Sequence, residues 1–187
     1  MSDSIWTSTL EAFRDRIASR EPVPAGVAMA AVSSAFALAL LCKVLQVTRN
    51  RKDFAGDADL ISELLAASLS TSQTLSRLAD DDVAAFREFM ACSKDPTATA
   101  DQRDAALRSS ITVPLDVART ASFGIELCEK AKGHIHWVVA PDLGIAAGLL
   151  AGAVRATLLT VNSNLEHLPE HHPFRLEASA EVGRLAI

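Results

Sequence analysis

The sequence has little of several features that mark common classes of protein. It has no excess of positive charge, because 18 Lys and Arg residues stand against 23 Asp and Glu, and this balance disfavours binding to nucleic-acid phosphates or an anionic membrane surface. Its three cysteines are odd in number and far apart, so they fit neither a disulfide framework nor a zinc knuckle. The first 20 residues lack the apolar stretch of a secretory signal. We therefore expect a cytoplasmic protein with reduced thiols.

Signatures of common catalytic sites are also scarce. We find no Gly-rich phosphate cradle, nucleophile elbow or Cys-His dyad. His134 and His136 alternate in a segment that we expect to be extended, which would place both on one side, but no third metal ligand is apparent near them. No metal is therefore expected.

What the sequence does contain is helical periodicity along 187 residues, 49% of them hydrophobic. Every strong periodic signal is helical, and the length suits one domain, residues 1–187. The expected fold is all-α, a bundle of five or six helices around two buried Ala-rich ones. The first helix is expected to start at the capping box 8–11. The third is expected to be one long helix or two helices joined by a kink, and Pro114 should bend or split the fourth. The segment 133–140 is expected to be an extended loop. The expected helices are 8–19, 25–47, 57–94, 99–132, 141–167 and a short one from Phe174.

Two apolar stretches, 27–47 and 143–161, approach the length that spans a membrane. Lys43 interrupts the first and Arg155 the second, and both stretches are rich in alanine rather than in large apolar residues. We interpret them as central helices of a bundle or as part of a subunit interface, and we expect no membrane association.

Six short segments occur in an order that is similar to a known family. They are Pro22-Val23-Pro24-Ala25-Gly26-Val27-Ala28, Arg51-Lys52-Asp53-Phe54, Asp81-Asp82-Val83-Ala84-Ala85-Phe86, Val113-Pro114-Leu115, Asp142-Leu143-Gly144-Ile145-Ala146-Ala147 and Val161-Asn162-Ser163-Asn164-Leu165. Over about residues 9–168 the chain resembles the cyclodeaminase/cyclohydrolase family, which comprises the cyclodeaminase part of formiminotransferase-cyclodeaminase and the methenyltetrahydrofolate cyclohydrolases. The resemblance implies an all-helical homodimer that acts on a tetrahydrofolate derivative.

The chain departs from the family pattern where a ligand would bind. Residues 25–28 stand where the family has Gly-Gly-Gly-Ser, and of these four residues only Gly26 lacks a side chain, so that its backbone could approach a ligand closely. Its Gly-Asn-x-Asn is replaced by 133–136, its Ser by Pro141, and two extra residues are inserted between these segments. Inheritance of the fold is therefore safer than inheritance of the activity.

The resemblance and the chemistry together select three candidate catalytic residues. Hydrolysis of a methenyl bridge needs a group that activates a water molecule and a group that stabilises the change in charge during the reaction. A carboxylate can serve both purposes. Asp142 is expected at a helix N-terminus, where the helix dipole favours the negatively charged form of its side chain. Asp82 is expected at the edge of the apolar stripe of its helix, whereas Asp80 and Asp81 are expected on the solvated face. Lys43, in an apolar helix, either reaches the surface or meets an anion such as Asp82 or a substrate carboxylate. A helix-capping role for Asp142 and a solvated position for Asp82 are the alternatives.

Five residues are candidates for binding the substrate: Gly26, Arg51, Lys52, His136 and Asn164. Arg51 and Lys52 suit the glutamate tail of a folate, although a solvated loop would look the same. His136 beside Trp137 is a candidate acid/base or stacking pair for a flat ring. Asn164 matches the family pattern better than Asn162.

Three hypotheses follow for the function. The first is a folate-dependent cyclohydrolase or cyclodeaminase that uses these residues. The second is a relative that acts on another small amidine or cyclic imine, and the third is a helical dimer without catalytic activity. All three include a homodimer, because the two apolar helices require more burial than one bundle of this length supplies.

Overall fold

The computed structural model describes residues 4–186, which contain six α-helices and no strand. This architecture confirms the expected all-α fold. Two short 3₁₀-helices, η1 (Ile5–Thr7) and η2 (Trp137–Val139), accompany the α-helices. The α-helices are α1 (Leu10–Ile17), α2 (Gly26–Arg49), α3 (Ala58–Lys94), α4 (Ala100–Ala131), α5 (Ala140–Leu165) and α6 (Pro173–Leu185).

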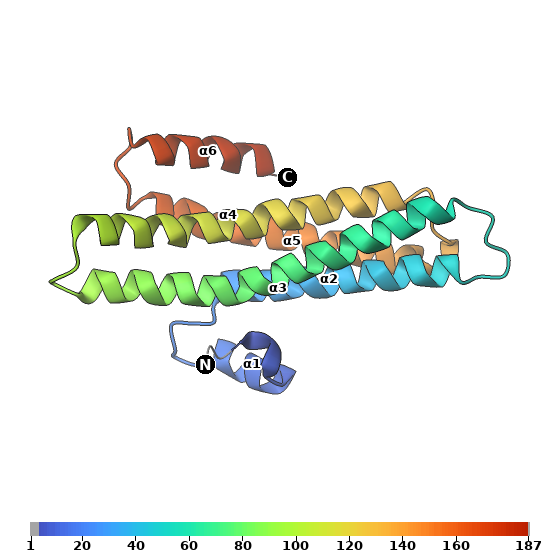
Figure 1. The fold of residues 1–187 in the computed structure, drawn as a ribbon, viewed down its shortest axis with the longest axis horizontal. Coiled ribbons are helices and arrows are strands. Elements are labelled where there is room, and N and C mark those ends of the chain that lie inside the picture. The colour runs from blue at the N-terminus through green and yellow to red at the C-terminus, as the bar shows by residue number, and fades with distance from the viewer. Residues whose placement is uncertain (1–3, 187) are drawn as a thin grey trace.

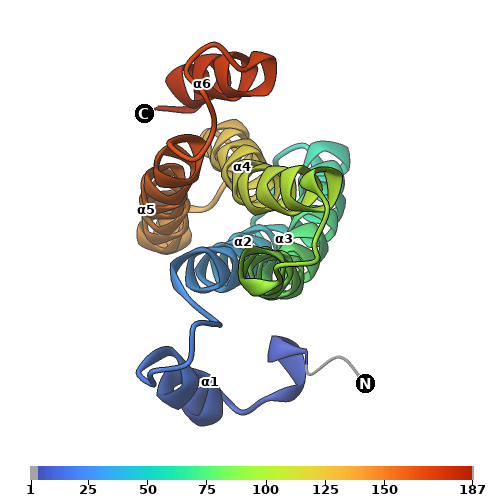
Figure 2. The ribbon, with the colours of Figure 1, turned by 90° about the vertical axis from the view of Figure 1, so that its left-hand side faces the viewer.

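The four long helices, α2 to α5, lie side by side as an elongated antiparallel bundle (Figure 1). Helix α2 packs against α3 and α5, and α4 packs against the same two helices from the other side. Seen along the bundle, α1 lies outside α2 and α6 lies outside the pair α4 and α5 (Figure 2). Within the described part of the chain, one side of α2 and one side of α5 therefore remain without a covering helix.

Local capping explains where three of the helices begin. The Asp57 carboxylate accepts hydrogen bonds from two backbone N–H groups at the start of α3, as the sequence predicts. Thr99 and Gln102 form a complete capping box at the start of α4. Helix α1 begins one residue later than its capping pattern predicts, because Thr9 rather than Ser8 accepts the bond from the N–H of Ala12.

Four expectations about individual segments and residues need correction or refinement. Helix α3 is a single helix of 37 residues, and α4 continues through Pro114 without being split. The segment 133–140 is not extended, because it turns tightly and forms η2 before α5 begins. Asp80 is not simply solvated, since its carboxylate accepts hydrogen bonds from the Ser4 hydroxyl and the backbone N–H of Ile5 and so ties the first residues of the described chain to α3.

The continuation of α4 through Pro114 has a specific cause. Proline has no N–H, so the carbonyl of Ser110, four residues earlier, lacks its normal helical partner. The side-chain amide of Asn164, on α5, donates to that carbonyl at 2.7 Å. A residue from the neighbouring helix thus satisfies the acceptor that proline leaves unpaired.

By length and composition, Gly26–Arg49 and Trp137–Leu165 both meet the requirements for crossing a bilayer. Most of α2 is buried by its neighbours, whereas α5 is buried along one side only. We define the α2/α5 face as the exposed apolar surface along these two helices. Its large members are Met29, Phe36, Ile145, Leu149 and Leu159, and Gly148 and Gly152 run between them with open space where a side chain would be.

Candidate functional site

One ion pair joins the two apolar helices near the end of the bundle where α2 finishes and α5 starts. The ammonium group of Lys43 lies 3.1 Å from a carboxylate oxygen of Asp142. Asp142 stands in the first turn of α5, as predicted, where backbone N–H groups and the helix dipole also favour a negative charge. Lys43 therefore meets an anion, but this anion is Asp142 and not Asp82.

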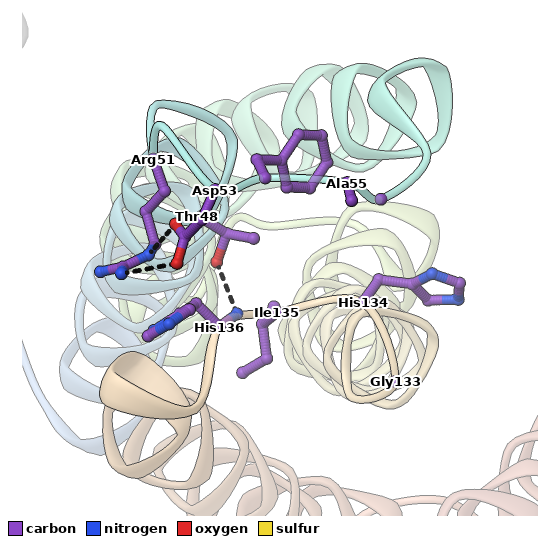
Figure 3. Close-up of a pocket in the computed structure, with 10 residues that line it drawn as sticks. Thr48, Arg51, Asp53, Ala55, Gly133, His134, Ile135 and His136 are labelled. Carbon is purple, nitrogen blue, oxygen red and sulfur yellow. Dashed lines mark hydrogen bonds and ion pairs between the residues drawn. The ribbon is translucent and has the colours of Figure 1, made fainter.

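A cavity of about 240 Å³ opens at this end of the bundle. Its walls come from the segment after α2 and from the segment before η2 (Figure 3). The two walls are tied together by the backbone N–H of His136, which donates to the buried hydroxyl of Thr48 at 3.0 Å. The lining residues are Thr48, Arg51, Asp53, Phe54, Ala55, Gly56, Gly133, His134, Ile135 and His136.

The two histidines of this segment have different surroundings. The rings of His134 and His136 point away from each other (Figure 3), which corrects the expectation that both lie on one side. The Nδ1 atom of His136 accepts a hydrogen bond from the N–H of Val138 at 3.2 Å. Its ring also lies beside the indole of Trp137, with 5.5 Å between ring centres. His136 is thus held in a fixed orientation at the edge of the cavity.

Arg51 lines the cavity but already has an anionic partner. Its guanidinium donates to both carboxylate oxygens of Asp53, at 2.8 and 3.0 Å. These hydrogen bonds raise the pKa of Arg51 and lower the pKa of Asp53. A substrate carboxylate would have to share or displace Asp53, whereas Lys52 is exposed in the adjacent turn.

Asp82 lies at the other end of α2. It is on α3, only 8% exposed, and burial raises its pKa to about 6 although a hydrogen bond from the backbone N–H of Ala28 opposes the shift. Gly26 stands next to this position, exposed in the first turn of α2. Since α2 rises about 1.5 Å per residue, Ala28 and Lys43 are about 22 Å apart. One chain therefore does not bring Asp82 to the pair of Lys43 and Asp142.

Asn164 is also remote from Asp142, near the opposite end of α5. Its amide group is engaged with the carbonyl of Ser110. This contact gives it a structural role within the chain, and its role in binding a ligand stays a prediction.

Two residues at the site, Thr48 and Asp53, are not among the candidates that the sequence suggests. They orient His136 and Arg51, and the contact between Thr48 and His136 joins residues 88 positions apart. Trp137, which the sequence pairs with His136 as a stacking surface for a flat ring, is 77% exposed. Within residues 4–186, no group of three or more His, Cys, Asp or Glu side chains is arranged to hold a metal ion.

Comparisons with known proteins agree with this architecture. The profile of the formiminotransferase-cyclodeaminase family matches residues 9–182. The chain is 31% identical over 172 residues to the methenyltetrahydrofolate cyclohydrolase of Methylorubrum extorquens, covering 87% of this chain and 81% of that relative. It is 29% identical over 176 residues to the formimidoyltransferase-cyclodeaminase of Rattus norvegicus, but it spans only 32% of that longer protein.

A solved structure shows the same fold. The crystal structure of formiminotetrahydrofolate cyclodeaminase from Thermotoga maritima superimposes with a TM-score of 0.90 at 26% identity, covering 97% of this chain and 89% of that one. The profile match extends over nearly the whole helical bundle. The chain belongs to the formiminotransferase-cyclodeaminase family.

Proposed function

We propose that this protein is a folate-dependent one-carbon enzyme that hydrolyses the methenyl bridge of methenyltetrahydrofolate. The observation that carries the proposal is the ion pair of Lys43 and Asp142 at the N-terminus of α5, at the same end of the bundle as an open cavity that neither residue lines. The similarity to a cyclohydrolase along 81% of that relative's length supports the same reaction. We further propose that the activity takes place in the cytoplasm, a location in which unpaired cysteines such as those of this chain stay reduced.

The reaction needs groups of the kind that this end of the bundle supplies. The methenyl bridge is a delocalised cation whose carbon lies between two nitrogens. A water oxygen bonds to that carbon, one carbon–nitrogen bond breaks, the released nitrogen takes a proton, and one proton leaves to solvent. Asp142 is the group that accepts the proton from water and faces the positive charge, and Lys43 holds its carboxylate in place.

The cavity accommodates part of such a substrate. Its volume of about 240 Å³ is below the 300–1,000 Å³ typical of sites that enclose a whole small molecule, so the remainder of the folate lies outside it. His136 and Lys52 are assigned to polar parts of the ligand. Arg51 is assigned to the glutamate tail, with Asp53 as the partner that the tail displaces or shares. No metal takes part in this proposal.

A second copy of the chain is the proposed cover of the α2/α5 face. The face combines exposed large apolar side chains with glycines that leave room for close helix contact. An exposed apolar area of this kind marks an interface. The exposed Arg155, in the middle of α5, would lie among lipid chains if that helix spanned a bilayer. We therefore propose a homodimer rather than a membrane protein.

The dimer also offers a role for Asp82. A two-fold axis perpendicular to α2, near its middle, makes the two α2 helices antiparallel and places Lys43 and Asp142 of one protomer near Gly26 and Asp82 of its partner. Each dimer would then hold two composite sites, each with one carboxylate from each protomer. Asp82, whose pKa of about 6 lies near the working pH, would relay the proton in such a site.

Complementation between two inactive variants tests this composite site. A mixed dimer of Asp82→Asn and Asp142→Asn chains holds one site with both carboxylates and one with neither. Random mixing after refolding together would restore about a quarter of wild-type activity. If both carboxylates act within one chain, the mixture stays inactive, and the proposal of a shared site is wrong.

The reaction itself is tested by binding and turnover. Wild-type protein is titrated with 5-formyltetrahydrofolate by calorimetry, and loss of the methenyl chromophore is followed with wild type and Asp142→Asn. Binding with turnover that the variant loses supports the proposal. Asp101→Asn is the matched control, because Asp101 stands in the first turn of α4 as Asp142 does in α5. Binding without turnover would favour a relative with another substrate, and absence of both would favour a dimer without catalytic activity.

Formiminotetrahydrofolate cyclodeamination is the second candidate function, supported by the similarity to the Thermotoga maritima structure. In that reaction the secondary amine N10, outside the pterin ring, attacks the formimino carbon and forms the second carbon–nitrogen bond of the bridge. The imino nitrogen takes up the proton lost by N10 and one proton from an acid, its bond to the carbon breaks, and it leaves as ammonia. Release of ammonia from 5-formiminotetrahydrofolate distinguishes it from the hydrolase, which releases none.

A further inference from the structure

Trp137 stands out in the described part of the chain because its side chain is 77% exposed, more than any other large hydrophobic side chain in residues 4–186. It forms the start of η2, directly before α5. Exposing an indole to water loses the large hydrophobic gain that burying it would give. Such a residue is a candidate for contact with a ligand.

The turn that carries Trp137 is held rigidly. His136 caps η2 by accepting a hydrogen bond from the N–H of Val138, and its own N–H is bonded to Thr48. Val139, at the end of the turn, is buried in the core. The indole therefore projects from a fixed support, so that little conformational entropy is lost when a ligand stacks on it.

Trp137 lies within reach of the proposed reaction centre. From Trp137 the chain passes through the rest of η2 into the first turn of α5, where Asp142 faces Lys43. The rise over this short helical path is on the order of 10 Å, about the length of two fused rings. A flat ligand whose reactive carbon lies at Asp142 can thus extend its ring system over the indole.

The ring of His136 adds a polar contact beside this surface. Because its Nδ1 accepts a hydrogen bond from the N–H of Val138, the hydrogen of the neutral ring is assigned to Nε2. The ring packs at a tilt of 38° against the indole. Together the two side chains present an aromatic face with a hydrogen-bond donor at its edge.

We infer that Trp137 is a specificity-determining residue, on which the flat conjugated ring system of a cationic substrate stacks. The inference rests on the proposed function. The face of an indole attracts a delocalised cation and has no such attraction for a neutral ring. Trp137 therefore favours binding of the charged methenyl form over the neutral ring-opened product. It lies in the segment where this chain departs from its family's Asn-rich pattern.

The test compares Trp137→Leu, Trp137→Phe and Leu176→Ala with wild type. Leucine keeps an apolar side chain but removes the aromatic face, phenylalanine restores one, and Leu176 is an exposed apolar residue on α6, away from the α2/α5 face. For Trp137→Leu we expect KM for methenyltetrahydrofolate to rise about tenfold while kcat changes less than about threefold. Trp137→Phe recovers most of the loss, and Leu176→Ala leaves KM near the wild-type value.

Two further measurements distinguish loss of the stacking contact from a change in assembly. Calorimetry with 5-formyltetrahydrofolate, which lacks the bridging cation, should show a smaller loss of affinity in Trp137→Leu than the loss measured with the methenyl form. Light scattering should show the same oligomeric state for all variants. An unchanged KM in Trp137→Leu, or a rise explained by altered assembly, would overturn the inference and leave the proposed reaction intact. A wild-type protein that binds folate but does not turn it over would instead overturn the reaction alone.

Discussion

The two ends of α2 hold carboxylates in opposite surroundings. At one end Asp142 is partly exposed and faces an ammonium group, at the end of the bundle where the cavity opens. At the other end Asp82 is buried among apolar side chains, with one backbone N–H as its partner, and its pKa is raised to about 6. Two carboxyl groups whose environments differ in this way are suited to different tasks. The first suits a carboxylate that faces a cation and takes a proton from water, and the second suits a group that passes a proton on near neutral pH.

The largest expected effect comes from removing the charge at the open end. Asp142→Asn keeps the shape of the side chain but loses the negative charge that faces Lys43, and we expect kcat to fall about 100-fold to 1,000-fold. Initial rates of chromophore loss, with circular dichroism to verify the helical content, measure this. The matched variant Asp101→Asn should retain full activity. A similar fall in both variants would mean that helix stability rather than chemistry explains the result.

At the buried end, the raised pKa of Asp82 predicts a specific dependence of stability on pH. Between about pH 4 and pH 6 the native state holds a proton that the unfolded state has released, so the free energy of unfolding decreases as pH rises through this window and is constant above it. The total decrease attributable to Asp82 is up to about 3 kcal/mol. Urea unfolding at several pH values would show this slope in wild type.

Asp82→Asn provides the comparison, because it removes the titrating group and should flatten that part of the profile. Asp81→Asn, on the exposed adjacent position, should keep the wild-type slope. If Asp82 also relays a proton in catalysis, kcat/KM of wild type should rise as pH increases through about 6, and this step should vanish in Asp82→Asn. Identical profiles for both variants would contradict the buried position of Asp82.

A substitution in the α2/α5 face, between the two ends of α2, is expected to have a smaller effect, and this effect is on dimer formation. Gly152→Arg inserts a long charged side chain into the α2/α5 face, where nothing in the described chain itself obstructs it. We expect dimer dissociation constants to rise by about 10-fold to 100-fold. Gly183→Arg is the control, because Gly183 on α6 is equally unobstructed but lies away from this face. Light scattering across a dilution series measures both, and an unchanged dimer in Gly152→Arg would place the interface elsewhere.

Local sequence patterns predicted the helices because the causes of helix formation are themselves local. Asp57 at the start of α3 and the pair Thr99 and Gln102 at the start of α4 act within one turn. The segment 133–140 was predicted less well, since its turn depends on the hydroxyl of Thr48 from a distant helix. Contacts of that kind leave no periodic trace in the sequence.

The candidate site was predicted in part for the same reason. The sequence identifies Asp142 and Lys43 but not their contact, which spans 99 positions, because the partners it suggests for Lys43 are Asp82 or a substrate carboxylate. Nothing in the spacing of residues shows that Asp82 and Asp142 lie near opposite ends of one helix. That separation follows from the antiparallel packing of both α3 and α5 against α2, and it is what suggests a site shared between protomers.

Asn164 yields the smallest predicted effect and tests why α4 tolerates a proline. Its amide donates to the carbonyl that Pro114 leaves without a helical partner, so Asn164→Ala should lower the free energy of unfolding by about 1–2 kcal/mol. KM should stay unchanged if the role is purely structural. In a Pro114→Ala background, the introduced alanine supplies its own N–H to the carbonyl of Ser110, and the cost of Asn164→Ala should fall by more than half. A double-mutant cycle measured by urea unfolding gives this coupling directly. Equal costs in the two backgrounds, together with a raised KM for Asn164→Ala, would instead assign Asn164 to the ligand, as the resemblance to the family first suggested.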